Sequence, residues 1–218
     1  MRNNSSHIKL VFFWIGLAVL LNVLANSFYK RFDLTNDKRY TLSEATLDIV
    51  ENARSVVLVE VLLQGNLPAE FRRLQAETRQ LLEEFSAHNS NIKFTFVNPV
   101  ENEEIAAEVQ NELAEIGILP ARVNTRESGR ITQTEVYPWA IISHNEMAVK
   151  VPLLKNQLGA TSEERITASL QNLEYAFADA FSKLLLPKKK KVAVLKGNGQ
   201  LDDAYIADFF STLREYYF

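Results

Sequence analysis

The sequence predicts an α/β protein made of an N-terminal transmembrane helix, a βαβαββα domain and the start of a second α/β domain. An apolar stretch near the N-terminus predicts the first part. A nearly continuous, β-branched apolar run from Ser55 to Leu63 predicts a buried central strand. Helical and strand patterns alternate after it. The expected boundaries are a tail at 1–9, an anchor at 10–29, a juxtamembrane stem and short helix at 30–53, the βαβαββα domain at 54–186, and the second domain at 187–218.

The stretch at 10–29 has the length of a membrane span, since twenty helical residues cover about 30 Å. Tyr29 suits the membrane interface and Lys30-Arg31 provides a charged stop, so the pattern favours a retained single span. Polar residues interrupt its second half, however. A signal peptide cleaved after Ala25 is the alternative.

Helical and strand patterns fill the region from the stem to Ile116. Thr41 and Glu44 match a capping box that would open a short helix. Apolar residues at helical spacing predict helices at Tyr40–Ala53, Pro68–His88 and Glu101–Ile116. Between them, the apolar run at Ser55–Leu63 and the alternation of side chains at Asn91–Val97 predict two strands.

Beyond Pro120 the pattern is first extended and then helical. Two extended parts are expected at Ala121–Arg126 and Arg130–Ser143, with a turn at Glu127–Gly129 between them. A further strand is expected at Met147–Leu153 and a long helix at Thr161–Pro187. Thr161 and Glu164 again match a capping box.

The last residues read as a strand, a glycine turn and a helix, at Val192–Leu195, Gly197–Gly199 and Asp202–Tyr217. One strand and one helix cannot bury an apolar side. We therefore expect the chain to be the N-terminal piece of a longer protein.

The order of elements from Ser55 onward is that of the thioredoxin-like core. Pro120 then stands where such proteins carry a cis-proline, which predicts a cis peptide bond at Leu119-Pro120. The place of the redox cysteines is taken by Gln64–Leu67, and the chain has no cysteine. Redox chemistry is therefore excluded, and the scaffold is left to bind or to space a partner.

No catalytic, cofactor or metal site is predicted. The Gly197–Gly199 turn has two of the three glycines of a dinucleotide fingerprint and no P-loop lysine. His7, His88 and His144 are scattered, acidic pairs lie on solvated helix faces, and Lys188–Lys191 reads as a connector. A net charge of -3 gives no pull toward nucleic acid.

One segment is distinctive enough to indicate a family. Arg31 to Thr46 reads RFDLTNDKRYTLSEAT and resembles the juxtamembrane signature of gliding-motility ABC-transporter accessory proteins, the GldG family. Leu173–Tyr175 and Val192–Gly199 are also similar to that family. The residues that match the signature are Leu34, Thr35, Arg39, Tyr40, Thr41, Leu42 and Ser43.

The resemblance implies a non-catalytic accessory subunit that binds a substrate or partner beside an ABC permease and its ATPase. It also implies a bacterial inner-membrane location, with a single span in this portion and a periplasmic main domain. Asn198 and Gln200 depart from the family, whose members often carry a histidine and an acidic residue at this turn. The alternative is a signal-peptide-bearing soluble extracytoplasmic enzyme or binding protein. Two roles are open for the stem. It contacts lipid headgroups or the membrane span of a partner, or it only sets the distance between the domain and the bilayer.

Overall fold

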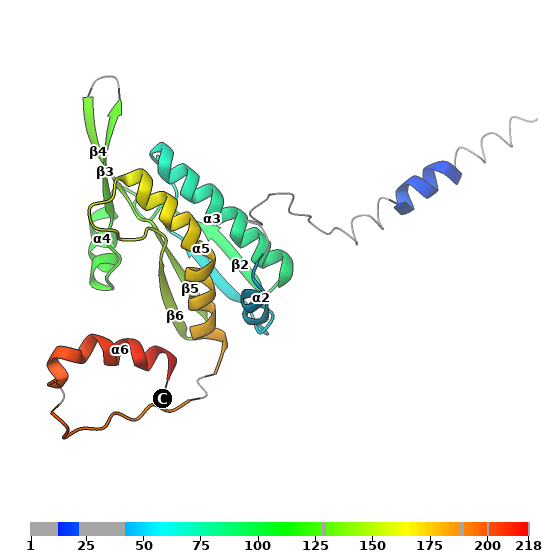
Figure 1. Cartoon of the computed structure of the whole chain (residues 1–218). Helices are drawn as coiled ribbons and strands as arrows, with labels where there is room; N and C mark the ends of the chain where they lie inside the picture. The colour runs from blue at the N-terminus through cyan, green and yellow to red at the C-terminus, as the bar shows by residue number, and fades with distance from the viewer. Residues whose placement is uncertain (1–12, 22–41, 128–129, 188–189, 200, 218) are drawn as a thin grey trace, which may run out of the picture. The chain divides into compact units, whose positions relative to one another are not determined.

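The computed structural model describes residues 13–21, 42–127, 130–187, 190–199 and 201–217 (Figure 1). The chain divides into two units, Met1–Thr41 and Leu42–Phe218. Each unit is described by itself below.

The first unit contains a helix over residues 13–21. Nowhere in the described parts of the chain is there a helix with the length and apolar character needed to cross a membrane. The transmembrane helix, and with it the single-pass inner-membrane placement, was therefore a wrong prediction. Residues 10–12 and 22–29 of the expected span lie outside the described residues.

The second unit contains the helices and strands labelled in Figure 1. In chain order they are α2 (Glu44–Val50), β1 (Val57–Val61), α3 (Ala69–His88), β2 (Ile92–Phe96), α4 (Ala106–Glu115), β3 (Ala121–Glu127), β4 (Arg130–Val136), β5 (Trp139–His144), β6 (Met147–Pro152), α5 (Ser162–Leu185), the 3₁₀ helix η1 (Asp203–Ile206) and α6 (Ala207–Tyr216).

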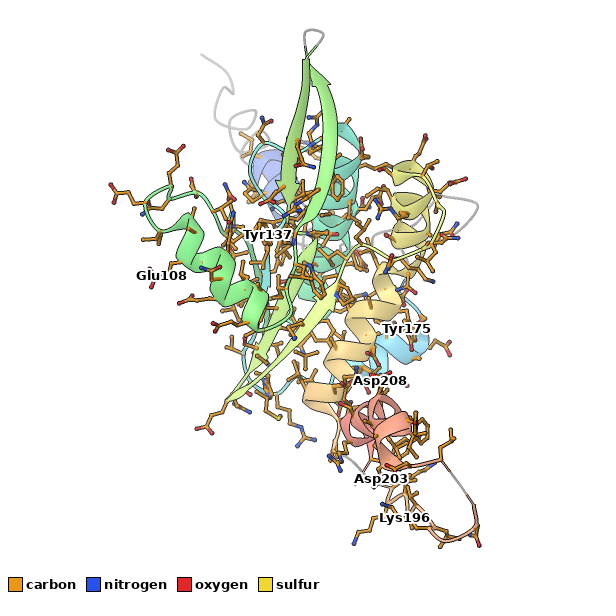
Figure 2. The ribbon with its side chains drawn as sticks, turned by 90° about the vertical axis from the view of Figure 1, so that its left-hand side faces the viewer. Glu108, Tyr137, Tyr175, Lys196, Asp203 and Asp208 are labelled. Carbon is orange, nitrogen blue, oxygen red and sulfur yellow. The ribbon has the colours of Figure 1, made fainter. Side chains whose placement is uncertain are left out.

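A four-stranded sheet in the order β2-β1-β5-β6 is the centre of the unit. β1 runs parallel to β2, while the β1–β5 and β5–β6 pairs are antiparallel. β3 and β4 form a separate antiparallel hairpin that projects beyond the end of this sheet (Figures 1 and 2). The structure thus has four strands between α4 and α5.

The predicted thioredoxin-like βαβαββα order was wrong. It has two strands between its last two helices, where the structure has four strands between α4 and α5. The extended region at 130–143 was taken as one part, but it is broken between β4 and β5 at Tyr137-Pro138. Pro138 has no backbone N–H to donate to a ladder, which explains the break. The predicted cis bond at Pro120 was wrong too: every peptide bond that the structure describes is trans.

The main core lies between one sheet face and the helices α3 and α5, which run side by side in Figure 1. Val57, Val59 and Val61 point to this side and are fully buried. Three phenylalanines fill the space between the two helices: ring centroids lie 5.3 Å apart for Phe85 and Phe181, 6.1 Å for Phe85 and Phe177, and 6.4 Å for Phe177 and Phe181. The two pairs that include Phe85 are edge-to-face, and such contacts add to the gain from apolar burial.

The opposite sheet face carries α4, which is seen on the far side of the sheet from α5 in Figure 2. Leu113 of α4 and Ile118 pack with Leu62 and Tyr137 in a second, smaller cluster. α4 begins later than the predicted start at Glu101 because Asn102 accepts the Glu104 N–H at 3.0 Å. Local bonds of this kind compete with helical ones.

The predicted strand at Val192–Leu195 is not formed. A strand needs a neighbour to pair with, and none is present in the described part of the chain. The predicted helix after it exists as η1 followed by α6, whose described residues are not buried. The start of a second α/β domain is therefore corrected to a helix without its strand.

Candidate interaction site

The signature segment enters the described structure at its last two residues. Leu34, Thr35, Arg39, Tyr40 and Thr41 lie outside the described residues. Leu42 is only 6% exposed and belongs to the main core. Ser43 caps α2, and its hydroxyl accepts the Thr46 N–H at 3.3 Å. Thr41 was the predicted cap, so this prediction was wrong by two residues.

Glu174, in the middle of α5, binds the start of α2. Its Oε1 accepts the Ser43 N–H at 2.8 Å and the Thr46 hydroxyl at 2.7 Å. The two hydroxyls of Ser43 and Thr46 also lie 2.9 Å apart, within hydrogen-bond distance. One carboxylate therefore joins segments that are 131 residues apart in the sequence.

The electrostatics of this contact favour the charged carboxylate. Burial alone would raise the pKa of Glu174, but the hydrogen bonds from Thr46 and Ser43 outweigh it and the pKa lies below its ordinary value. A negative charge at the first turn of α2 also suits the helix dipole. Glu174 is thus ionised at neutral pH.

The residues on either side of Glu174 have opposite environments. Leu173 is buried in the main core, whereas Tyr175 is 69% exposed (Figure 2). Leu42–Ser43 and Leu173–Tyr175, two segments noted separately in the sequence, thus meet in one place. The sequence signal that could have linked these two segments is the position of Glu174 beside the apolar stripe of its helix. A carboxylate at such a position needs hydrogen-bond donors from another part of the chain.

The loop after β1, where redox proteins would carry their cysteines, is held by side-chain amides. Gln75 Nε2 donates to Leu63 O and to Gln64 Oε1, both at 2.7 Å. Gly65 has φ +108°, and a Cβ there would lie 3.1 Å from the Asn98 amide nitrogen. This loop is therefore closely packed.

A cavity of about 390 Å³ lies next to α5. It is lined by residues of three segments, including Trp139, Leu153, Lys155, Asn156, Asn172 and Leu173. Trp139 was predicted to serve core packing; it is half-buried, and its indole N–H donates to Leu119 O at 2.9 Å. Its neighbour Tyr137 is buried. Burial, and to a smaller extent the nearby negative charge of Glu135, raises the pKa of the Tyr137 hydroxyl.

A polar cluster connects α5 to α6. Lys183 Nζ lies 2.9 Å from Asp179 and 2.7 Å from Glu215, and 4.7 Å above the Tyr216 ring. The Tyr216 hydroxyl donates to Asp179 at 2.7 Å. Burial lowers the Lys183 pKa, but the bonds to Glu215 and Asp179 more than compensate and raise it above its ordinary value.

The other sequence candidates are not brought together. His88 lies 3.4 Å from Glu84 on its own helix, His144 Nδ1 lies 3.3 Å from Val56 O, and His7 is outside the described residues. Within the described ranges no three His, Cys, Asp or Glu side chains are grouped to hold a metal ion. Gly197 and Gly199 have φ of +100° and +76° and form a turn.

Of the four connector lysines, Lys190 and Lys191 are exposed, while 188 and 189 are outside the described residues.

Residues 36–143 match the family model of a domain of unknown function, DUF7088. The matched region starts within the stem and ends within β5, so it includes α2 and stops short of β6 and α5. No curated protein and no solved structure matches the chain. About half of the chain is thus similar to a domain whose function is unknown.

Proposed function

We propose that this chain is a non-catalytic, partner-binding accessory subunit of an ABC transporter linked to gliding motility. The supporting observation is the contact of Ser43 and Thr46 with Glu174. Two of the three segments that resemble the GldG family take part in it, although they are far apart in the sequence. Their meeting supports the finer family assignment, beyond similarity to a domain of unknown function.

The chemistry of the contact favours binding over catalysis. Glu174 is ionised and accepts two hydrogen bonds from its own chain, so it is not poised to donate or accept a substrate proton. Its role is to hold α2 against α5. Exposed Tyr175 next to it offers the kind of side chain that is enriched at protein interfaces.

Site-specific photocrosslinking tests the proposal. A photoreactive phenylalanine derivative replaces Tyr175 in the chain, produced in gliding bacteria together with the transporter. Adducts with the permease or the ATPase are expected and can be identified by mass spectrometry. The matched control places the same group at Lys93, an exposed position on the sheet face opposite α5.

Two results would contradict the proposal. One is the absence of any permease or ATPase adduct at Tyr175. The other is an equal yield of such adducts at Tyr175 and Lys93, because that would show contact without a preferred surface.

A further inference from the structure

The cavity beside α5 has walls that are held in place by hydrogen bonds. The buried Ser169 hydroxyl accepts the Lys155 N–H at 2.8 Å and donates to the Arg165 carbonyl at 2.6 Å. On the other side, Leu153 N donates to the Pro138 carbonyl at 2.9 Å. These bonds connect the segment after β6 both to α5 and to the start of β5. The cavity is thus formed before any ligand binds.

Apolar side chains provide most of the lining. Leu153 and Leu173 are buried residues of this lining, and Leu154 and Ala176 complete its apolar part. A volume of about 390 Å³ lies within the range typical of small-molecule sites. The cavity can therefore hold a branched aliphatic side chain together with a polar head group.

The polar lining has one charge and two amides. Lys155 is the ionisable residue of the lining, and no carboxylate accompanies it. Lys155, Asn156 and Asn172 form no side-chain hydrogen bond or ion pair with any part of the chain that the structure describes. An ammonium group attracts an anion, while an amide can both donate to a carboxylate and accept from a peptide N–H.

We propose that this cavity binds a carboxylate attached to an apolar group, with the aliphatic part against Leu154 and Leu173 and the carboxylate beside Lys155. Two sources share this chemistry: the C-terminal residue of a polypeptide and a free branched-chain carboxylic acid. Asn156 and Asn172 would favour the first, because a peptide group can use both the donor and the acceptor of an amide. This proposal does not depend on the transporter assignment.

Heat of binding is the main readout, and Trp139, at the edge of the lining, provides a second one. The chain has two tryptophans, and Trp14→Phe leaves Trp139 alone. The full chain with this change is titrated with N-acetyl-leucine, with N-acetyl-leucinamide and with 4-methylpentanoate, and Trp139 fluorescence and heat of binding are recorded. Saturable binding of N-acetyl-leucine is expected, with the neutral amide at least about tenfold weaker because it lacks the charge that pairs with Lys155.

Variants assign the effect to the cavity. Lys155→Gln is expected to weaken N-acetyl-leucine about tenfold and to leave the neutral amide unchanged. Lys155 is exposed, so the variant keeps the fold, which circular dichroism verifies. Lys191→Gln, at an exposed position away from the lining, is the matched control and leaves binding unchanged.

The remaining outcomes are distinct. N-acetyl-leucine binding more tightly than 4-methylpentanoate, with the difference lost in Asn172→Ala, supports a polypeptide C-terminus. Equal binding of these two ligands supports a free acid in the same site. The proposal is overturned by the absence of saturable binding, by equal affinity for the acid and the neutral amide, or by binding that Lys155→Gln does not change.

Discussion

Replacing Glu174 by Gln tests whether one carboxylate holds α2 against α5. Gln keeps an oxygen that can accept from Ser43 and Thr46 but removes the charge. Hydrogen bonds to charged groups contribute about 1.5–3 kcal/mol each, against about 0.5–1.5 kcal/mol for neutral ones. Because this contact is partly exposed and water can replace part of it, we expect a loss of about 1.5 kcal/mol in the free energy of unfolding for the two bonds together.

The loss is measured by urea unfolding and by the midpoint of thermal unfolding. For a domain of this size, about 1.5 kcal/mol corresponds to a fall of roughly 3–6 °C in the midpoint. Hydrogen exchange gives the local view, since amides of α2 should lose protection while those of β1 keep theirs. Glu83→Gln, exposed on α3, is the control and should stay within about 0.5 kcal/mol of the wild type.

The pH dependence provides the decisive test of the reasoning. The pKa of Glu174 is lower in the folded protein than in the unfolded chain, so the carboxylate stabilises the fold above its unfolded-state pKa. This contribution is lost as the pH falls through the folded-state pKa. The difference between wild type and Glu174→Gln should therefore disappear in acid. A difference that persists unchanged at low pH, or that matches Glu83→Gln at neutral pH, would refute the argument.

Three further changes have defined outcomes. Thr161→Ala removes the confirmed capping box of α5 and should lower the free energy of unfolding by about 1 kcal/mol, while Thr161→Ser, which keeps the hydroxyl, should cost far less. Phe181→Ala leaves a cavity between α3 and α5 and should cost about 3–5 kcal/mol in urea unfolding; a cost below 1 kcal/mol would show that the core collapses around it. Lys183→Gln breaks the cluster with Asp179 and Glu215, so proteolysis and hydrogen exchange within α6 should accelerate while the midpoint for the sheet stays unchanged; equal α6 protection in both proteins would contradict this. The pKa of Lys183 is raised in the folded protein, so its contribution to the protection of α6 should be fully present below the ordinary lysine pKa. It should be lost only as the pH rises through the raised, folded-state pKa.

Local signals in the sequence were sufficient for several elements. The apolar run at Ser55–Leu63 contains β1, the stripe at Pro68–His88 contains α3, and the Thr161 capping box begins α5. Each of these depends on residues within one or two helical turns or one strand. The capping box is present because both partners lie within four residues of each other.

Contacts between distant residues decided what the sequence could not predict. A strand at Val192–Leu195 had the right composition, but composition does not provide a pairing neighbour. Ser43, and not Thr41, caps α2 because Ser43 N–H and Thr46 are bound by Glu174 across 131 residues. The DUF7088 match ends at residue 143, so it does not include the helix that supplies this carboxylate.

The carboxylate of Glu174 also determines how a mechanical load would travel. A pull applied to the chain ahead of Leu42 reaches α2 first, and Glu174 passes part of it into α5, while the bonds of Asn89 to the Val50 and Ala53 carbonyls pass another part toward β2. Tension that enters at one end of the unit is therefore shared between α5 and the sheet. The share carried by α5 passes through two hydrogen bonds on one oxygen, which can re-form when the tension is released.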